Sequence, residues 1–356
     1  MTLEEAIRKI KPINMKMCER ARIKWDNIGK PLRSLGRLEE MIIQLAGIQE
    51  TENPVANKKA VLIFCADNGI VEEGVTQTSS DVTAIVTENF TKGIASINSF
   101  SKVCGADVYP VDIGICKDMK LDGVINKKIA YGTKNMAKGF AMTRRECIEA
   151  IEVGINLIAE LKKKGYNMII TGEMGIGNTS TSSAIISVLE NVPVEDVTGK
   201  GAGLSKTGIQ HKIEMIKKAI EINKPNAKDP IDVLHKVGGL DICGITGAFI
   251  GGAVNRIPVL IDGFISAVAA NCAIRLEPQC ERYMFASHCS AEPAGELALK
   301  AINKEAYIKC GMSLGEGTGA VVGAKLFDFA LAAYKEIGSF EDARFGRYEL
   351  FENPEL

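Results

Sequence analysis

Four short apolar segments, each ending in a polar or glycine-rich turn, restrict the possible folds of this chain most strongly. They are AVLIFCADNG (60–69), DVYPVDIGI (107–115), NMIITGEMGIG (167–177) and IPVLIDGF (257–264). Such runs are typical of buried strands, and helical patterns separate them. This alternation predicts an α/β fold with a parallel, Rossmann-like sheet. Because the carboxyl ends of parallel strands meet at one edge, we expect a ligand to bind there.

The helical patterns indicate how the chain is divided. One helix is expected to begin at Thr143 and to end near Gly165. Thr143 and Glu146 have capping-box spacing, and apolar residues recur at helical spacing from there to Gly165. The first 50 or so residues contain only helical patterns, and the tail from Leu326 is helical again before it becomes charged and irregular. We therefore predict a small helical domain formed by residues 1–55 and 326–356. A large α/β domain, residues 56–325, would carry the active site.

Charge and cysteine usage exclude several classes of protein. A formal charge of −1 over 356 residues is not typical of a protein that binds nucleic acid or an anionic membrane. The first residues, MTLEEAIRKI, resemble a capped helix rather than a signal peptide, and no apolar run approaches membrane-spanning length. Ten scattered cysteines without a CxxC pair, and only three histidines, predict reduced buried thiols and no metal site. A cytoplasmic protein is expected.

The segment TGEMGIGNTSTSSAI (171–185) has the spacing of a phosphate-binding loop without its lysine. Four residues separate Gly172 from Gly177, and Asn178 follows at the position where a nucleoside-triphosphate P-loop needs lysine. A strand, a glycine turn and a helix start would present free backbone amides to an anion. A phosphate monoester fits this loop better than a triphosphate, which disfavours a kinase or ATPase. The alternative is a tight turn that only lets the strand and the helix approach each other.

Other polar segments leave alternatives open. LGEGTGAVVG (314–323) sets Glu316 between two glycines, where a carboxylate shielded beside a ligand could act as a general base or simply lie in a surface turn. Neither this cluster nor TGKGAGLS (198–205) has dinucleotide-binding spacing, so a nicotinamide-dependent oxidoreductase is poorly supported and no cofactor is predicted. FASHCSAEPAGE (285–296) lines a ligand or forms a hydrogen-bonded loop, and Asp67 and Asn68 hold hydroxyls or cap a turn.

Nine segments, taken in order, resemble the nicotinate-nucleotide–dimethylbenzimidazole phosphoribosyltransferase family from about residue 30 to residue 325. They are KPLRSLGRLE, ADNGIVEEGVT, VTAIVTENFTKG, GEMGIGNTS, GKGAGL, VGGLDICGITGA, PVLIDGFISAVAA, SHCSAEP and LGEGTGA. Members of this family transfer the 5-phosphoribosyl group of nicotinate mononucleotide to the lower-ligand base of a cobamide. The products are nicotinate and an α-ribotide. Members are dimers, so the resemblance also implies a homodimer.

The resemblance implies a role for individual residues. Glu316 would take the proton of the acceptor as it attacks the ribose C1′ from the face opposite nicotinate. The loop around Gly175 and Gly177 would hold the 5′-phosphate, and Lys212 would help to neutralise it. The remaining implied substrate-binding residues are Glu173, Asn178, Gly201, Gly203, Asp262, Ser290, Ala291, Leu314 and Gly315. Of these, Glu173 and the glycines at 201–203 would line the nucleotide side, Ser290 and Ala291 would lie near nicotinate or ribose, and Asp262 would support the ribose side.

Two departures from the family pattern concern the acceptor. Members that use benzimidazoles often carry Gln at the position of Val86 and Arg at the position of Ser313. An apolar Val86 would suit an acceptor without a second ring nitrogen, such as phenol or p-cresol, as used by heterodimeric relatives. The chain could also be a catalytically silent partner subunit. If Val86 is ordinary variation, 5,6-dimethylbenzimidazole remains the acceptor.

Overall fold

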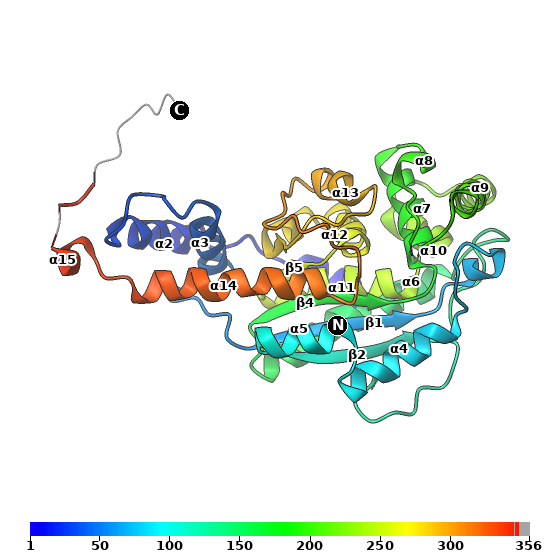
Figure 1. The fold of residues 1–356 in the computed structure, drawn as a ribbon, viewed down its shortest axis with the longest axis horizontal. Helices are drawn as coiled ribbons and strands as arrows, with labels where there is room; N and C mark the ends of the chain where they lie inside the picture. Colours follow the sequence, from blue (N-terminus) through cyan, green and yellow to red (C-terminus); the bar gives the residue numbers. More distant parts are fainter. Residues whose placement is uncertain (202, 345, 349–356) are drawn as a thin grey trace.

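The computed structural model describes residues 1–201, 203–344 and 346–348, which form a six-stranded sheet with helices on both faces (Figure 1). The strands are β1 (Lys59–Ala66), β2 (Ala106–Gly114), β3 (Ile125–Asn126), β4 (Met168–Met174), β5 (Val259–Ile261) and β6 (Met284–Ala286). Their order is β3-β2-β1-β4-β5-β6, and all neighbours are parallel. The α/β Rossmann-like prediction is therefore confirmed. The strand order reverses between β1 and β4, where ligands bind in such sheets.

The four predicted strands correspond to β1, β2, β4 and β5. All eight residues of β1 are buried, because this strand pairs with β2 on one side and with β4 on the other and is covered on both faces. Strands of this kind read as continuous apolar runs. β3 and β6 were not predicted, because they have only two and three residues and are too short to show a pattern.

Helices cover both faces of the sheet. One face carries α4 (Asp81–Lys92), α5 (Ser96–Cys104) and α14 (Thr318–Glu336), and the other carries α6 (Arg144–Lys163), α11 (Leu240–Asn255) and α12 (Phe264–Leu276) (Figure 1). The predicted capping box at Thr143 is present, and Gly165 after the helix has φ +86°. α6 and α11 pack backbone against backbone, since a Cβ at Gly247 would lie 1.9 Å from the Ile151 carbonyl oxygen.

A further group of helices stands beyond the carboxyl edge of the sheet. It comprises α7 (Asn178–Glu190), α8 (Val194–Val197), α9 (Lys206–Asn223) and α10 (Pro230–Val237), which follow β4 in the chain. The 3-10 helix η1 (Gly69–Glu73) follows β1, η2 (Pro278–Tyr283) precedes β6, and α13 (Gly295–Ala301) follows β6. These elements supply much of the surroundings of the site described below.

The three helices predicted near the N-terminus are present as α1 (Leu3–Lys9), α2 (Met15–Asn27) and α3 (Arg37–Gln49), and α15 (Phe340–Ala343) lies in the tail. α2 and α3 pack with the C-terminal half of α14, where the rings of Trp25 and Tyr334 are 5.0 Å apart. α1 instead packs against α6 and α11, and the Leu3 amide donates to Glu152 Oε1 at 2.9 Å. The division into two domains stays a prediction, and its residues 345 and 349–356 lie outside the described residues.

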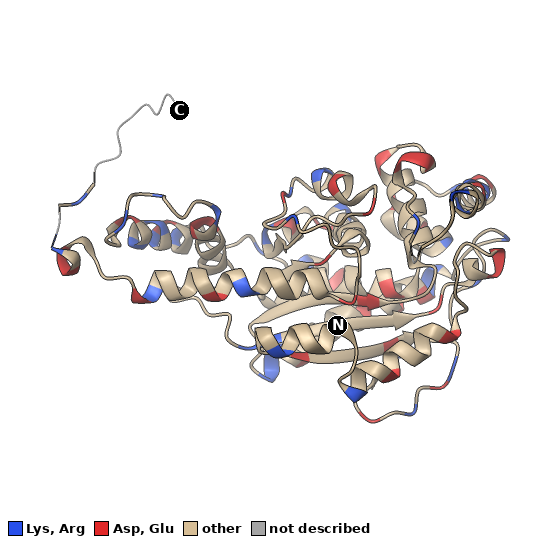
Figure 2. Ribbon diagram, viewed as in Figure 1, with Lys and Arg blue, Asp and Glu red and all other residues tan. Residues whose placement is uncertain are grey.

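The surface and the thiols agree with the composition of the chain. Basic and acidic residues are interspersed over the ribbon in Figure 2. All ten cysteines are free thiols, and most are buried. In the described ranges, no helix combines the length and the apolar character needed to cross a bilayer.

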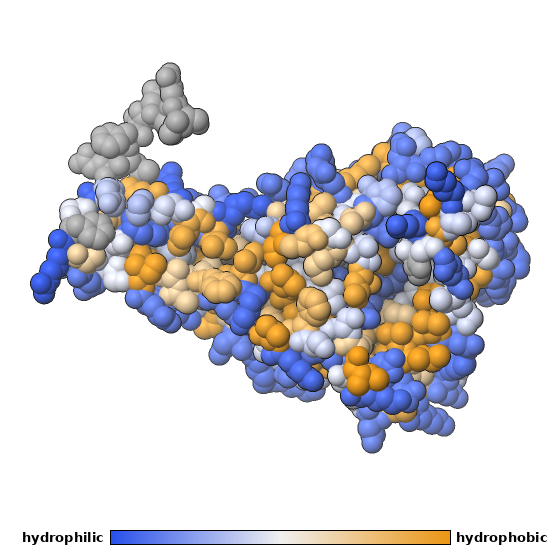
Figure 3. Space-filling model, in the orientation of Figure 1, coloured by the Kyte–Doolittle hydropathy of each residue, from blue (hydrophilic) through white to orange (hydrophobic). Residues whose placement is uncertain are grey.

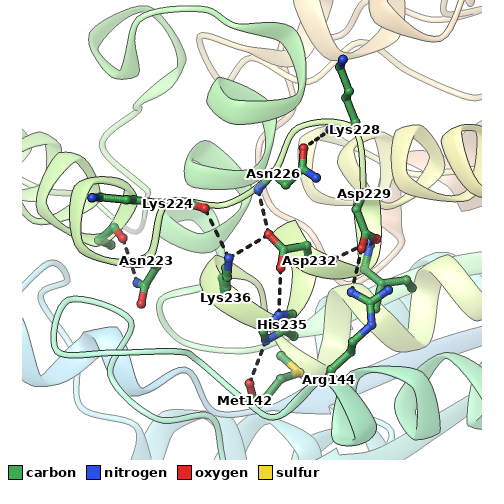
Figure 4. A network of polar contacts seen from close by, with 12 residues as sticks. Met142, Arg144, Asn223, Lys224, Asn226, Lys228, Asp229, Asp232, His235 and Lys236 are labelled. Atoms are coloured by element: carbon green, nitrogen blue, oxygen red, sulfur yellow. Dashed lines mark hydrogen bonds and ion pairs between the residues drawn. The ribbon is translucent and has the colours of Figure 1, made fainter.

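A polar network anchors the C-terminal end of α9 (Figure 4). Asp232 on α10 accepts hydrogen bonds from the Asn226 amide at 2.7 Å and from His235 Nε2 at 3.3 Å, and it pairs with Lys236 at 2.9 Å. Lys236 also donates to the carbonyl of Lys224, the residue that follows α9. The network therefore ties α10 to the end of the helix that carries Lys212.

We expect Asp232→Ala to lower the free energy of unfolding by about 1–3 kcal/mol, because the buried His235, the half-buried Lys236 and the Asn226 amide lose their shared acceptor. Burial raises the pKa of Asp232, but hydrogen bonds from the Asn226 amide, Lys236 and His235 outweigh it and lower the pKa below its ordinary value. The stabilisation is therefore present at neutral pH and is lost as pH falls through the folded-state pKa. Chemical denaturation at pH 7 and in acid measures both effects. The exposed Asp122→Ala is the control, and an equal loss in both variants would contradict the prediction.

Candidate active site

One cavity lies at the carboxyl ends of β4, β5 and β6 and encloses a volume of about 230 Å³. Its lining includes the following predicted site residues: Glu173, Gly175, Gly177, Asn178, Gly201, Lys212, Asp262, Ser290, Leu314, Gly315 and Glu316. These residues come from six separate segments, so the fold brings together side chains that are up to 143 positions apart in the sequence (316 minus 173). The cavity borders the point where the strand order reverses, because Val75 and Thr76, which follow β1, also line it.

The glycine turn at 175–177 leads directly into α7. A Cβ at Gly175 would lie 2.4 Å from the Ala66 carbonyl oxygen, and Gly177 has φ +93°, so both positions require glycine. The N-cap Gly177 offers no side-chain acceptor, and the first turn of α7 contains no acidic residue. The first amides of a helix lack intrahelical acceptors and carry the positive end of its dipole. The turn is therefore suited to hold an anion.

Lys212 places a positive charge beside this turn. Its side chain comes from α9 and is buried, and Nζ donates to Thr179 Oγ1 at 2.8 Å and to the Gly199 carbonyl at 3.4 Å. Burial lowers the pKa of Lys212 to about 8, while the nearby Glu292 opposes this shift. A bound phosphate would supply the negative charge that the ammonium lacks. A P-loop takes its positive charge from a lysine of the loop itself. Here Lys212, from another part of the chain, supplies the charge instead.

Glu316 lies in a turn of unusual backbone conformation. Gly315, Glu316 and Gly317 have φ values of +89°, +62° and +90°, and a left-handed glutamate is strained unless its surroundings hold it. The side chain is half-buried, and Oε2 accepts a hydrogen bond from the Ile97 amide at 3.0 Å. Burial raises the pKa of Glu316, and the Ile97 hydrogen bond opposes that shift. A carboxylate of this kind is suited to accept a proton from a ligand near neutral pH.

Asp262, at the end of β5, holds the backbone that follows Glu316. Oδ2 accepts from the Gly317 amide at 3.2 Å and Oδ1 from the Ala320 amide at 2.8 Å, so Asp262 caps the first turn of α14. His288 Nε2 lies 3.7 Å from Oδ1. The same carboxylate lines the cavity. Asp262 therefore contributes to the shape of the turn as well as to the wall of the site.

Glu173 belongs to a buried group of three polar residues. The side-chain amide nitrogen of Asn178 donates to Glu173 Oε2 and, at 3.2 Å, to Asp241 Oδ2. Burial and the neighbouring charge of Asp241 raise the pKa of Glu173 to about 8, and burial raises the pKa of Asp241 to about 7. Asn178 thus bridges two carboxyl groups directly under the glycine turn.

Sequence reasoning did not assign a role to Asp241. It occurs in the quoted segment VGGLDICGITGA, where a single acid in an otherwise apolar helix was the available signal. His288 and Glu292, which were left open as part of a loop, both line the cavity. The structure therefore places His288, Ser290 and Glu292 of the 285–296 segment at the cavity.

Three predicted residues are not among those that line the cavity. Val86 lies on α4, partly buried against the core, one turn beyond Thr83, whose hydroxyl accepts from the Ile176 amide at 3.2 Å. The Gly203 carbonyl accepts a hydrogen bond from the Gln77 side chain. The Ala291 amide donates to the Met312 carbonyl at 2.9 Å, which joins the two loops that carry Ser290 and Ser313. Ser313 itself lines the cavity.

The cavity thus combines a positively polarised turn with a half-buried carboxylate. The first can bind a phosphorylated substrate, and the second can remove a proton from an attacking group. This combination fits the transfer of a phosphorylated group to a weakly acidic nucleophile.

Comparison with known proteins identifies the family. The model described as Phosphoribosyltransferase matches residues 10–345. The nicotinate-nucleotide–dimethylbenzimidazole phosphoribosyltransferase of Ruminiclostridium cellulolyticum is 50% identical over 352 residues, covering 99% of this chain and 100% of the relative. The protein of the same name from Acetivibrio thermocellus is 52% identical over 324 residues, covering 91% and 92%.

A solved structure agrees with these relatives. The crystal structure of CobT from Thermus thermophilus matches with a TM-score of 0.89 and 32% identity, covering 94% of this chain and 100% of that one. Sequence and fold agree over nearly the whole length of the molecule. We conclude that this chain belongs to the phosphoribosyltransferase family.

Proposed function

We propose that this enzyme transfers the 5-phosphoribosyl group of nicotinate mononucleotide to 5,6-dimethylbenzimidazole, giving nicotinate and an α-ribotide. The observation that carries the proposal is that the glycine turn, Lys212 and Glu316 line one cavity. The names of the relatives supply the two substrates. Because these relatives are named for dimethylbenzimidazole, they favour this acceptor over the phenolic alternative and over a silent partner subunit.

In this proposal each part of the site has a separate task. The backbone amides at 175–179 and Lys212 hold the 5′-phosphate. This way of binding a single phosphate group requires neither a triphosphate nor a metal ion. One ring nitrogen of the acceptor attacks the ribose C1′, and the bond from C1′ to the nicotinate nitrogen breaks with its electron pair. Glu316 takes the proton from the other ring nitrogen of the acceptor. Binding both reactants in line can contribute roughly 7–11 kcal/mol in well-oriented cases.

A chromatographic assay of the purified chain tests the proposal. Nicotinate mononucleotide would be offered with dimethylbenzimidazole, phenol or p-cresol in parallel, and nicotinate release and ribotide formation would be followed. A benzimidazole ribotide as the preferred product is expected. A phenolic ribotide as the preferred product would overturn the acceptor and make Val86 a candidate for specificity. No product with any acceptor would contradict catalysis by this chain alone.

We also propose that the enzyme is a homodimer. Support comes from an apolar surface along α5 and α14, where Val103 and Phe329 are 75% and 66% exposed (Figure 3). A groove of about 430 Å³ between these helices is lined by Phe100, Val103 and Val322, among others. Exposed apolar surface of this kind marks interaction sites.

A cytoplasmic location is proposed as well, because ten free thiols persist in a reducing compartment. Cell fractionation checks this proposal.

Val103→Glu is expected to shift the enzyme from dimer to monomer, since a charge cannot be buried unpaired in an apolar interface. Light scattering of the wild-type chain and of the variant measures the masses. Lys102→Glu, also a change to glutamate on the surface of α5, serves as control. A monomeric wild type at assay concentration would contradict the homodimer.

A further inference from the structure

The start of α5 lies against the carboxylate of Glu316. Ile97 is the second residue of this helix, and its amide donates to Glu316 Oε2 at 3.0 Å. An amide at this position has no intrahelical acceptor, so it can bond to the carboxylate without weakening the helix. The positive end of the helix dipole also faces the carboxylate.

The start of α5 is itself firmly held. Asn98 accepts from the Ala95 amide at 3.1 Å, and its side-chain nitrogen donates to the Phe90 carbonyl at 3.0 Å, which joins α5 to the end of α4. The Ile97 side chain is fully buried in the core. The amide therefore has a defined position relative to the sheet, and it does not depend on the strained turn that carries Glu316.

The two oxygens of the carboxylate have different surroundings. Oε2 is occupied by the Ile97 amide, whereas in the described parts of the chain no residue forms a hydrogen bond with Oε1. The side chain lines the cavity. Building on the proposed function, we propose that the Ile97 amide is a positioning group that fixes Glu316 through Oε2 and leaves Oε1 to receive the proton of the acceptor.

This contact has an electrostatic consequence. Burial and the charge of Asp262 raise the pKa of Glu316, and the hydrogen bond from Ile97 acts in the opposite direction. Removing the amide would raise the pKa further. Since a general base works only when it is ionised, the acid limb of the rate profile would then move to higher pH. A merely structural role for α5 would not move this limb.

Ile97→Pro removes the N–H in the first helical turn, where proline is tolerated. We expect the acid limb of kcat/KM for the acceptor to move up by about one pH unit, so that the rate on the acidic side of the limb falls about tenfold. Ser96→Pro places proline one residue earlier and keeps the Ile97 amide, and Ile97→Ala keeps the amide but shortens the side chain. Both controls are expected to leave the limb at its wild-type position. In a Glu316→Gln background, Ile97→Pro should have little further effect.

An equal shift in Ile97→Pro and Ser96→Pro, or no shift in either, would overturn the inference. If Ile97→Pro fails to fold, an amide-to-ester replacement at residue 97 removes the same N–H and keeps the isoleucine side chain. The inference also has a readout without catalysis. The carboxyl carbon resonance of Glu316, assigned by its absence in Glu316→Gln, should titrate at higher pH when the amide is removed. This separates a failure of the inference from an inactive wild type, which would contradict the proposed function.

Discussion

Glu316→Gln is expected to lower kcat by about 10²- to 10⁴-fold, the usual contribution of a positioned general base. The glutamine side chain has nearly the same shape and keeps an oxygen that can accept from the Ile97 amide, whereas it cannot take a proton at neutral pH. Nucleotide affinity should change little, because the phosphate would be held by the 175–179 turn and Lys212.

Steady-state nicotinate release and calorimetric titration with nicotinate mononucleotide measure the two effects. Glu336→Gln, at the exposed C-terminal end of α14, the helix that follows the Glu316 turn, is the control. Burial raises the pKa of Glu316, so the wild-type rate should fall as pH drops through that raised value. The variant should lack this limb. Wild-type turnover in Glu316→Gln would show that another group removes the proton.

Lys212→Met is expected to raise KM for nicotinate mononucleotide about 10- to 100-fold, because a charged hydrogen bond contributes roughly 1.5–3 kcal/mol. Methionine is flexible and fills a similar volume at this buried position without the charge. Effects on kcat should be smaller, since the phosphate is remote from the bond that breaks. Lys218→Met, on the exposed side of α9, is the matched control.

The pH dependence of nucleotide binding gives a second readout for Lys212. Burial lowers the pKa of Lys212 to about 8, so the free enzyme loses this positive charge as pH rises above that value. KM for the nucleotide should therefore rise above pH 8 in the wild type and stay nearly flat in Lys212→Met. A wild-type KM independent of pH between 7 and about 9.5, or an unchanged KM in the variant, would exclude Lys212 from the phosphate site.

Local patterns in the sequence were sufficient for much of the fold. β1 reads as a strand because its residues are apolar throughout, and α6 reads as a helix because Thr143 and Gly165 mark its ends. The glycine turn at 175–177 was recognisable because only glycine fits its conformation. Each of these signals depends on a residue and its near neighbours in the chain, so no tertiary structure is needed to read it.

Other features depend on segments that meet only after folding. β6 is too short to show a period, and its pairing with β5 defines it. Asp241 acquires its role because α11 brings it to Asn178, and the Ile97 amide reaches Glu316 across 219 positions of chain. A buried carboxyl group takes its pKa and its hydrogen bonds from whatever residues the fold places around it. The sequence by itself therefore determined β1, β2, β4 and β5, the ends of α6 and the glycine turn. The tertiary structure decided which polar groups share the cavity, because desolvation and hydrogen bonding act between neighbours in space.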